Sequence, residues 1–163
     1  MRRIISLLLE NESGALSRVI GLFAQRGYNI ETLAVAPTDD ETLSRLTLTT
    51  VATDEQSEQI TKQLNKLIEV VKLVDLTDGE YIEREFMLIK IRVSSSEKAE
   101  VKSTTDIFRG QIVDVSPASY TVQLIGTSEK LDAFMHAMAE FRVIEVVRSG
   151  VSGLSRGDKA LSL

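Results

Sequence analysis

Residues 10–16 read Glu10-Asn11-Glu12-Ser13-Gly14-Ala15-Leu16, and this stretch joins an apolar run at residues 4–9 to a second apolar pattern. Behind it, apolar side chains recur with the spacing i, i+3, i+4 and i+7, at Leu16, Val19, Ile20 and Phe23. That period is typical of an amphipathic helix, whereas the run before it favours a buried strand. Because Asn11 is a residue type that caps helices or forms turns, the stretch predicts a strand, a polar turn and a helix.

The predicted turn is suited to hold a carboxylate. The first amide groups of a helix have no acceptor within the helix, and the helix N-terminus carries a partial positive charge. Gly14 has no side chain that would block a ligand. We expect the helix to end at Arg26-Gly27, after which the chain reaches Asn29, whose amide group both donates and accepts hydrogen bonds. These residues predict half of a binding unit for a small zwitterion.

The N-terminal half has the pattern strand, helix, strand, strand, helix, strand. Strands are predicted at residues 2–9, 28–36, 43–52 and 69–76, and a second helix at residues 55–67. The first and last strands are apolar on both faces, which is typical of central strands. Residues 37–40 contain proline and two aspartates, and they predict the hairpin loop between the middle two strands.

The C-terminal half repeats this order. Strands are predicted at residues 86–93, 111–115, 120–125 and 143–147, and helices at residues 97–108 and 129–138. The run Ile-Glu-Val-Val-Lys at residues 68–72 recurs as Ile-Glu-Val-Val-Arg at residues 144–148, which favours a duplication. The sequence therefore predicts an α+β protein with two ferredoxin-like βαββαβ domains at residues 1–78 and 79–163, the second with a mobile tail from Ser152 onward.

The two halves differ at the turn before their first helix. The second half has Ser94-Ser95-Ser96-Glu97 there, which is a capping sequence without a glycine. We therefore expect the first domain to bind the ligand and the second to pack or modulate. A chain that ends near Asp78 is expected to retain ligand binding.

Several of these segments together resemble a known family. They are residues 11–19 (Asn-Glu-Ser-Gly-Ala-Leu-Ser-Arg-Val), 23–30 (Phe-Ala-Gln-Arg-Gly-Tyr-Asn-Ile), 36–40, 44–47, 107–115, 126–127, 130–134 and 148–150. The first two resemble the opening of an ACT domain, an amino-acid-sensing module. The ordered set is similar to the small, regulatory subunit of acetohydroxyacid synthase, also called acetolactate synthase, over nearly the whole chain.

The resemblance implies a non-catalytic subunit of branched-chain amino acid biosynthesis that activates a large catalytic subunit and confers feedback inhibition. The effector would be valine, bound where the ACT domains of a homodimer meet. The implied ligand-binding residues are Asn11, Ser13, Gly14, Ala15, Leu16, Asn29 and Ile30. This chain would hold no cofactor, whereas the catalytic partner, a transferase, would carry thiamine diphosphate, Mg²⁺ and FAD.

Composition and motifs exclude other classes of protein. The formal net charge is −5 and no basic stripe is present, so we expect no nucleic-acid partner. The chain has no cysteine and no apolar run of about 20 residues, so we expect a cytoplasmic protein without a membrane span. No catalytic motif is evident, and the acidic run Asp39-Asp40-Glu41 lacks the ligand spacing of a calcium loop, so no metal site is expected.

Three alternatives stay open at this point. In the first, Asn11 and Gly14 only cap a helix and let the backbone pass closely, without binding a ligand. A free-standing ACT protein that binds an amino acid and regulates another enzyme or a transcription factor would share the same N-terminal pattern. An enzyme in its own right is the third alternative, although the acidic loop after the first strand would repel a phosphate.

Overall fold

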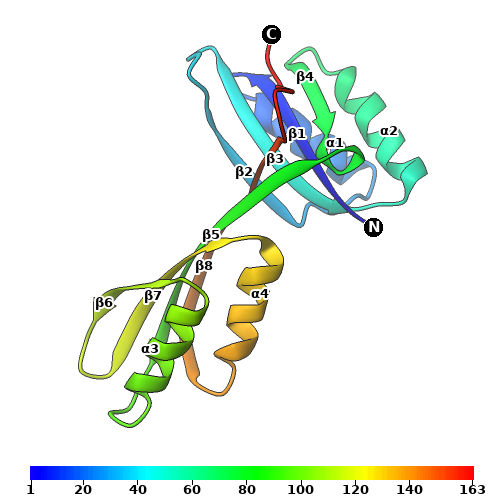
Figure 1. The fold of residues 1–163 in the computed structure, drawn as a ribbon. Helices are drawn as coiled ribbons and strands as arrows, with labels where there is room; N and C mark the ends of the chain where they lie inside the picture. Colours follow the sequence, from blue (N-terminus) through cyan, green and yellow to red (C-terminus); the bar gives the residue numbers. More distant parts are fainter. The chain divides into compact units, whose positions relative to one another are not determined.

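The structure, a computed structural model, describes residues 1–163 and contains two four-stranded sheets (Figure 1). In the first half the elements are β1 (Arg2–Glu10), α1 (Ala15–Gln25), β2 (Thr32–Pro37), β3 (Leu43–Val51), α2 (Asp54–Asn65), β4 (Val70–Asp75) and the short 3-10 helix η1 (Leu76–Asp78). The strand order is β2-β3-β1-β4, and the pairs are antiparallel. Both helices lie on one face of this sheet (Figure 1).

The core of the first half lies between the sheet and the two helices. Alternate residues of β1 point toward the helices, and Ile5 and Leu7 are fully buried there against Val19 and Phe23 of α1. This alternation follows from the two-residue period of a strand. The topology is that of a ferredoxin-like βαββαβ domain, which confirms the predicted fold.

Two predictions about the strands of the first half were wrong. β4 is an edge strand and not a central one, since its only neighbour in the sheet is β1. The edge strand β2 begins at Thr32, not at residue 28. The Tyr28 ring instead packs edge-on against Phe23, with 6.2 Å between ring centroids, and Tyr28 and Ile30 cover the core. The segment before Thr32 stays beside β3, since the Glu31 amide donates to the Thr49 carbonyl over 2.8 Å, but it does not extend the strand.

The second half repeats the same architecture with its own core. Its elements are β5 (Tyr81–Arg92), α3 (Lys98–Ile107), β6 (Gln111–Val115), β7 (Ser119–Gly126), α4 (Ser128–Ala137) and β8 (Arg142–Ser155). The strand order β6-β7-β5-β8 matches that of the first sheet. Buried Met87, Ile89 and Phe134 belong to this core, so the predicted second ferredoxin-like domain is confirmed.

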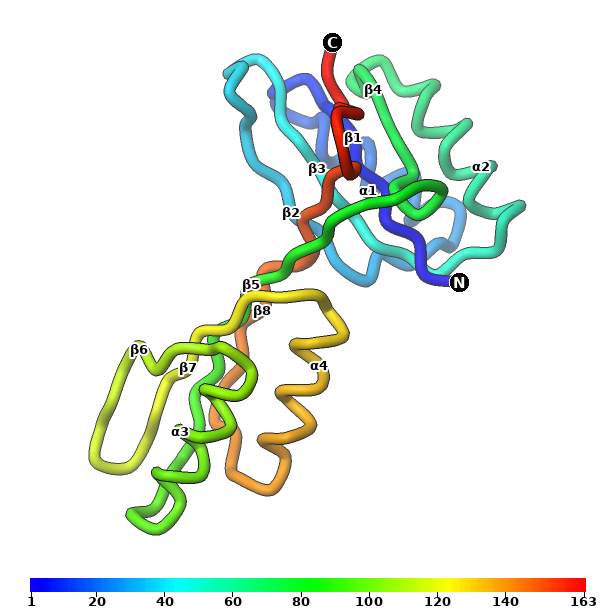
Figure 2. Tube along the Cα trace, viewed as in Figure 1, coloured from blue at the N-terminus to red at the C-terminus, as the bar shows by residue number.

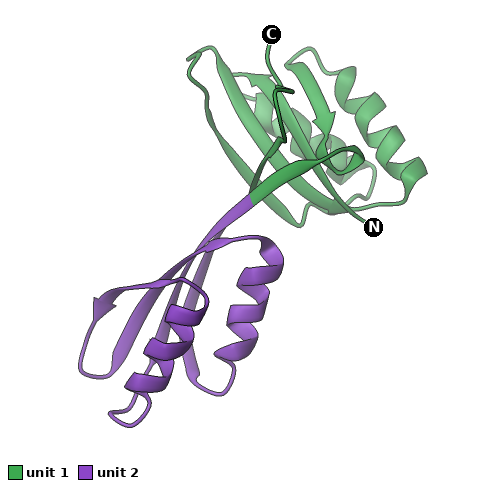
Figure 3. Ribbon diagram, viewed as in Figure 1, with its two compact units in different colours: residues 1–83, 151–163 green, residues 84–150 purple.

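The chain divides into two compact units at positions that differ from the predicted boundary. One unit comprises residues 1–83 and 151–163, and the other comprises residues 84–150 (Figure 3). The division falls within β5, after Glu83, and within β8, after Gly150, so both strands belong partly to each unit. The predicted strand at residues 143–147 continues to Ser155, which places residues 152–155 in a strand where a mobile tail was predicted.

The C-terminal segment covers the outer face of the first sheet, which is the face opposite the helices. Val151 is fully buried with Ile4 of β1 and Leu76 of η1, in a cluster separate from the helix-side core. The Arg45 side chain donates to the carbonyl oxygen of Gly153 over 2.9 Å. Figure 2 shows this segment, at the red end of the chain, running across the first sheet. A chain that ends at Asp78, which is predicted to retain ligand binding, lacks this segment and therefore exposes Ile4.

Arg3 joins α2 and η1 to the sheet. Its side chain is 6% exposed, and its Nη1 lies 2.9 Å from Asp78 and 3.5 Å from the buried carboxylate of Asp75, while Nη2 contacts Asp54. Asp75 also accepts a hydrogen bond of 2.8 Å from Ser57 of α2. Because three carboxylates meet one guanidinium, this arginine neutralises a buried acid and anchors the N-terminal end of α2.

Substitution of Arg3 by methionine is expected to lower the free energy of unfolding by about 3 kcal/mol, because it leaves the buried Asp75 carboxylate without its charge partner. Urea titration followed by circular dichroism measures this quantity. The matched control is Lys62→Met, which breaks the exposed pair of Lys62 with Glu58 and should cost only about 0.3 to 0.5 kcal/mol. Equal losses in the two variants would show that the Arg3 cluster contributes no more than a surface ion pair.

Candidate functional site

The N-terminal end of α1 is open. Gly14 is the N-cap residue, its φ of 91° lies in the left-handed region, and no side chain caps the helix there. The first helical hydrogen bond runs from the amide of Arg18 to the carbonyl of Gly14, so the amides of Leu16 and Ser17 have no backbone acceptor in the chain. A Cβ atom added at Gly14 would meet nothing within 4 Å. The turn therefore presents free amide donors and open space in front of them.

The other helices of the chain begin differently. Thr53 caps α2 by accepting a 3.1 Å bond from the amide of Gln56, and Thr127 caps α4 in the same way with Lys130 at 3.2 Å. At α3 the N-cap residue is Glu97, whose carboxylate accepts from the Ser94 amide and supplies a negative charge at the helix end. Of the two α-helices of the first unit, α2 is capped by the Thr53 side chain and α1 has no side-chain cap, so the end of α1 is open to an external acceptor.

Asn11 supports the turn and does not cap the helix. Its side-chain amide donates to the carbonyl of Glu41 over 2.9 Å, and its backbone amide donates to the carbonyl of Thr42 over 2.8 Å. The N-cap of α1 is Gly14, so the prediction that Asn11 is the N-cap was wrong. The prediction that Asn11 is a turn residue is confirmed. The hairpin at residues 38–42 is thus a support of the site that the sequence reasoning missed.

That hairpin is itself held by Asp40. Its carboxylate accepts from the hydroxyl and the amide of Thr42, over 2.6 Å and 2.9 Å. These two bonds, of which the hydroxyl bond has the larger effect, hold the pKa of Asp40 below its ordinary value. The spacing Thr38-x-Asp40-x-Thr42 was the signal for this turn, since short polar side chains form such local bonds.

The predicted second part of the site lies on the segment before β2. The Asn29 side chain is exposed, and Ile30 is half-buried against the helix-side core. The carbonyl of Asn29 accepts a 2.6 Å hydrogen bond from the buried hydroxyl of Thr50 in β3. The backbone at Asn29 is therefore fixed to the sheet while its amide side chain is free to meet a ligand.

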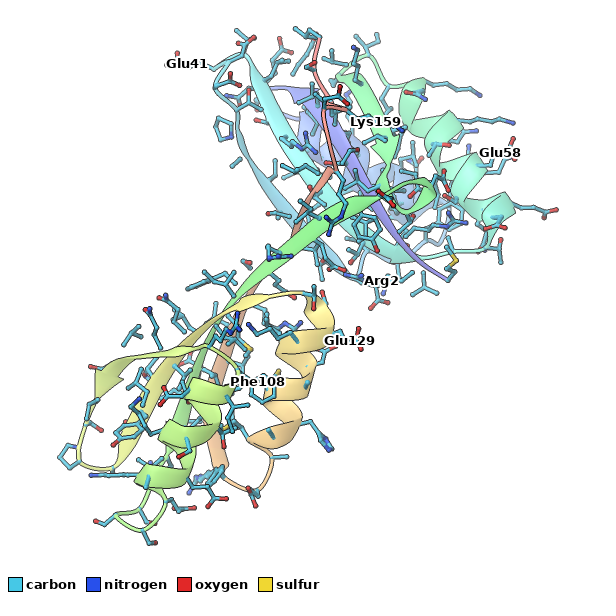
Figure 4. All side chains as sticks on the ribbon, viewed as in Figure 1. Arg2, Glu41, Glu58, Phe108, Glu129 and Lys159 are labelled. Atoms are coloured by element: carbon cyan, nitrogen blue, oxygen red, sulfur yellow. The ribbon has the colours of Figure 1, made fainter.

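The two predicted parts lie at opposite ends of the same sheet. In the β1 and β3 pairing, Glu10 stands opposite Leu43 next to the turn, whereas Arg3 stands opposite Thr50 next to Asn29. The two pairs are seven residue steps apart along β1, which is about 23 Å at ~3.3 Å per residue. In Figure 4 the labelled Glu41 marks the turn end of the first sheet and Arg2 marks the other end. One chain therefore does not bring Gly14 and Asn29 together.

The remaining predicted residues differ in the groups that they expose to a ligand. Ser13 is exposed beside Gly14, whereas Ala15 is 3% exposed, so Ala15 can contribute little besides its backbone. The amide of Ala15 is already bonded to the carbonyl of Glu12 at 3.3 Å. Leu16 is half-buried and packs against the same core as Ile30. The amides of Asn11, Glu12 and Ala15 are bonded within the chain, whereas the amides of Ser13, Gly14 and Leu16 have no backbone acceptor. The amide of Ser17, which was not among the predicted donors, is also available.

Replacing Thr50 by valine tests whether the sheet positions Asn29. The change keeps the shape of the side chain and removes the bond to the Asn29 carbonyl, which is worth about 0.5 to 1.5 kcal/mol. We expect effector affinity to fall by roughly 2- to 10-fold, as measured by titration calorimetry. Thr49→Val is the neighbouring control, since Thr49 bonds Thr32 and not Asn29. An unchanged affinity in Thr50→Val would remove Thr50 from the support of the site.

The first unit has the order β2-β3-β1-β4, two helices on one face and an open turn after the first strand, an arrangement that ACT domains share. Residues 5–72 match a family model described as "AHAS small subunit-like ACT domain", and residues 84–157 match one described as "Small subunit of acetolactate synthase". The chain belongs to the family of acetolactate synthase small subunits.

Individual relatives agree with this assignment. The chain is 62% identical over 162 residues to the "Acetolactate synthase isozyme 3 small subunit" of Salmonella typhimurium, and 62% identical to the protein of that name from Escherichia coli, covering 99% of this chain and 99% of the relative in each case. The crystal structure of the acetolactate synthase small subunit from Thermotoga maritima superimposes with a TM-score of 0.88 at 34% identity, over 98% of this chain and 99% of that one.

None of the helices combines the length and the hydropathy that a membrane span would need.

Proposed function

We propose that this chain is the regulatory subunit of an acetolactate synthase, which activates a large catalytic subunit and makes it sensitive to feedback inhibition by valine. The observation that carries the proposal is the pair of half-sites in the first unit. One end of its sheet offers the free amides behind Gly14, and the other end offers the exposed amide of Asn29. Neither half-site by itself surrounds an amino acid.

A second copy of the chain would complete the site. β2 is an edge strand whose outer side is unpaired within the chain, and such an edge is suited to pair with its symmetry mate across a twofold axis. Antiparallel pairing of two β2 strands sets the Pro37 end of one against the Thr32 end of the other. The turn of one protomer then lies on the same side as Asn29 of its partner. The dimer would hold two equivalent ligand sites.

The recognition chemistry of valine fits these groups. Its carboxylate would accept from the amides of Leu16 and Ser17 at the helix N-terminus, which contributes about 0.3 to 2 kcal/mol. Asn29 from the other chain would accept from the ammonium group. The isopropyl group would lie against Leu16 and Ile30, and burial of such a side chain contributes about 1.5 to 3 kcal/mol. After the costs of association these terms predict a modest affinity, which suits the sensing of an end product.

Regulation would act through the dimer. Because valine would contact both protomers, its binding would favour one relative orientation of the two ACT domains, with a coupling of about 1 to 3 kcal/mol to the catalytic subunit. The condensation itself would take place on that partner, with thiamine diphosphate, Mg²⁺ and FAD bound there. This chain would contribute no catalytic residue.

Reconstitution tests the proposal. The purified catalytic subunit is assayed for acetolactate formation alone, with this chain, and with this chain plus valine. We expect a rise in rate on addition of the chain and a fall on addition of valine. A pull-down from cell extract with the tagged full-length chain should recover a thiamine-diphosphate enzyme. Recovery of a different enzyme or a transcription factor, with no change in the synthase rate, would overturn the proposal.

A further inference from the structure

The outer face of the first sheet contains a hollow that the valine site does not use. It has a volume of about 390 Å³, at the lower end of the range for small-molecule sites. Its apolar lining comes from the sheet, through Leu8 and Leu43, and from the C-terminal segment, through Leu161 and Leu163. Leu8 and Leu43 are 4% and 9% exposed and lie outside the helix-side core, and Leu161 of the C-terminal segment lines the hollow together with them.

One wall of this hollow carries a cation that has no carboxylate partner in the chain. Arg45 donates to the hydroxyl of Ser6 over 3.1 Å and to the carbonyl of Gly153 over 2.9 Å, and both acceptors are neutral. A guanidinium has five N–H donors, so most of its hydrogen-bonding capacity remains for an anionic group. Burial holds the pKa of Arg45 below its ordinary value, which is the effect expected of a cation without a counter-charge.

The opposite charge lines the same hollow. Asp39 and Asp40 belong to its wall, and Asp40 uses one oxygen for Thr42, which leaves the other unbonded. A purely anionic ligand would be repelled by these carboxylates, and a purely cationic one by Arg45. A molecule that carries both charges and an aliphatic side chain matches all three parts of the lining.

We infer that this hollow is a second binding site, for a free aliphatic amino acid, distinct from the site at Gly14 and Asn29. The ligand carboxylate pairs with Arg45, the ammonium group pairs with Asp39 and Asp40, and the side chain lies against Leu8, Leu43 and Leu161. The site stands within one protomer and needs no second copy.

The proposed second site shares the hairpin at residues 38–42 with the turn of the valine site. The hairpin at residues 38–42, which forms part of the hollow, accepts both hydrogen bonds from Asn11 through the carbonyls of Glu41 and Thr42. A ligand that restricts this hairpin also restricts the turn that ends at Gly14. Occupation of the second site therefore changes the affinity of the first.

Methyl NMR on the full-length chain tests the inference. The Gly14→Asp variant is used to disable the first site, its leucine and valine methyl groups are labelled, and L-leucine is titrated. We expect saturable shifts of the Leu8, Leu43 and Leu161 methyl signals. Leu161→Trp, which fills the hollow, should abolish them. The matched control is Leu154→Trp, on the same C-terminal segment, where Leu154 is 55% exposed and does not line the hollow.

Two further measurements test whether the charged groups of the protein and of the ligand are needed for binding. Arg45→Gln and Asp39→Asn should each weaken L-leucine binding at least tenfold by the same shifts. The acid 4-methylpentanoate and the amine 3-methylbutylamine, which each lack one charge, should bind at least tenfold more weakly than L-leucine. The inference is overturned by an absence of saturable shifts, by shifts that survive Leu161→Trp, or by equal binding of the acid or the amine. Because none of these readouts uses the catalytic subunit, they stand apart from the proposed feedback function.

Discussion

Gly14→Asp is expected to abolish feedback inhibition by valine while the variant still activates the catalytic subunit. The aspartate side chain would project into the open space in front of the helix end, where the effector carboxylate is proposed to bind. Two like charges about 4 Å apart near a protein surface repel by about 4 kcal/mol, which corresponds to a loss of affinity of more than about 100-fold. The measurement is the valine concentration that halves the rate of the reconstituted enzyme.

Gly14→Asn is the matched control for this variant. The φ of 91° at this position strains any residue with a side chain, and asparagine tolerates the left-handed region better than most. Asparagine has nearly the size of aspartate but no charge, so the difference between the two variants measures the electrostatic part alone. We expect Gly14→Asn to keep a substantial part of the inhibition. Wild-type sensitivity in both variants would refute a carboxylate site at this turn.

Asn29→Ala is expected to weaken valine binding by about 1 to 3 kcal/mol, or roughly 5- to 150-fold. The substitution removes the side-chain amide of Asn29, an exposed residue, and leaves the carbonyl that accepts from Thr50 in place. The backbone should therefore keep its position while the polar contact to the ligand is lost. Titration calorimetry with valine on the purified chain gives the dissociation constant directly.

Asn65→Ala provides the comparison. Asn65 is an exposed asparagine at the end of α2, so the same chemical change is made at the surface of the same unit. Its affinity for valine should equal that of the wild type. If Asn29→Ala and Asn65→Ala both bind valine as the wild type does, Asn29 has no role in recognition.

The sequence predicted the topology because hydrophobic periodicity fixes which face of each element is buried. Ile5 and Leu7 alternate as a strand requires, and the spacing of Val19 and Phe23 is that of a helix. The repeated Ile-Glu-Val-Val run predicted that the second half has the same order of elements. The bounds of β6 were predicted without error, and those of most other elements within two residues.

The path of β8 was not predictable in the same way. Residues 151–155 read Val-Ser-Gly-Leu-Ser, and the two serines and the glycine favour a loop by local composition. They form a strand because Val151 is buried against Ile4 and Leu76, residues about 75 to 150 positions away in the sequence. Such contacts leave no local signal, and the same reason explains why the role of Arg45 and the support of Asn11 by Glu41 were missed.

A mixed dimer tests the central claim most directly. A Gly14→Asp chain and an Asn29→Ala chain, carrying different affinity tags, are co-expressed, and the heterodimer is purified through both tags and titrated with valine. If each site takes its turn from one chain and Asn29 from the other, one of the two sites combines both defects and the other is intact. The heterodimer should then bind one valine with wild-type affinity, although each parent dimer binds poorly. A heterodimer that binds as poorly as its parents would contradict a site shared between two chains.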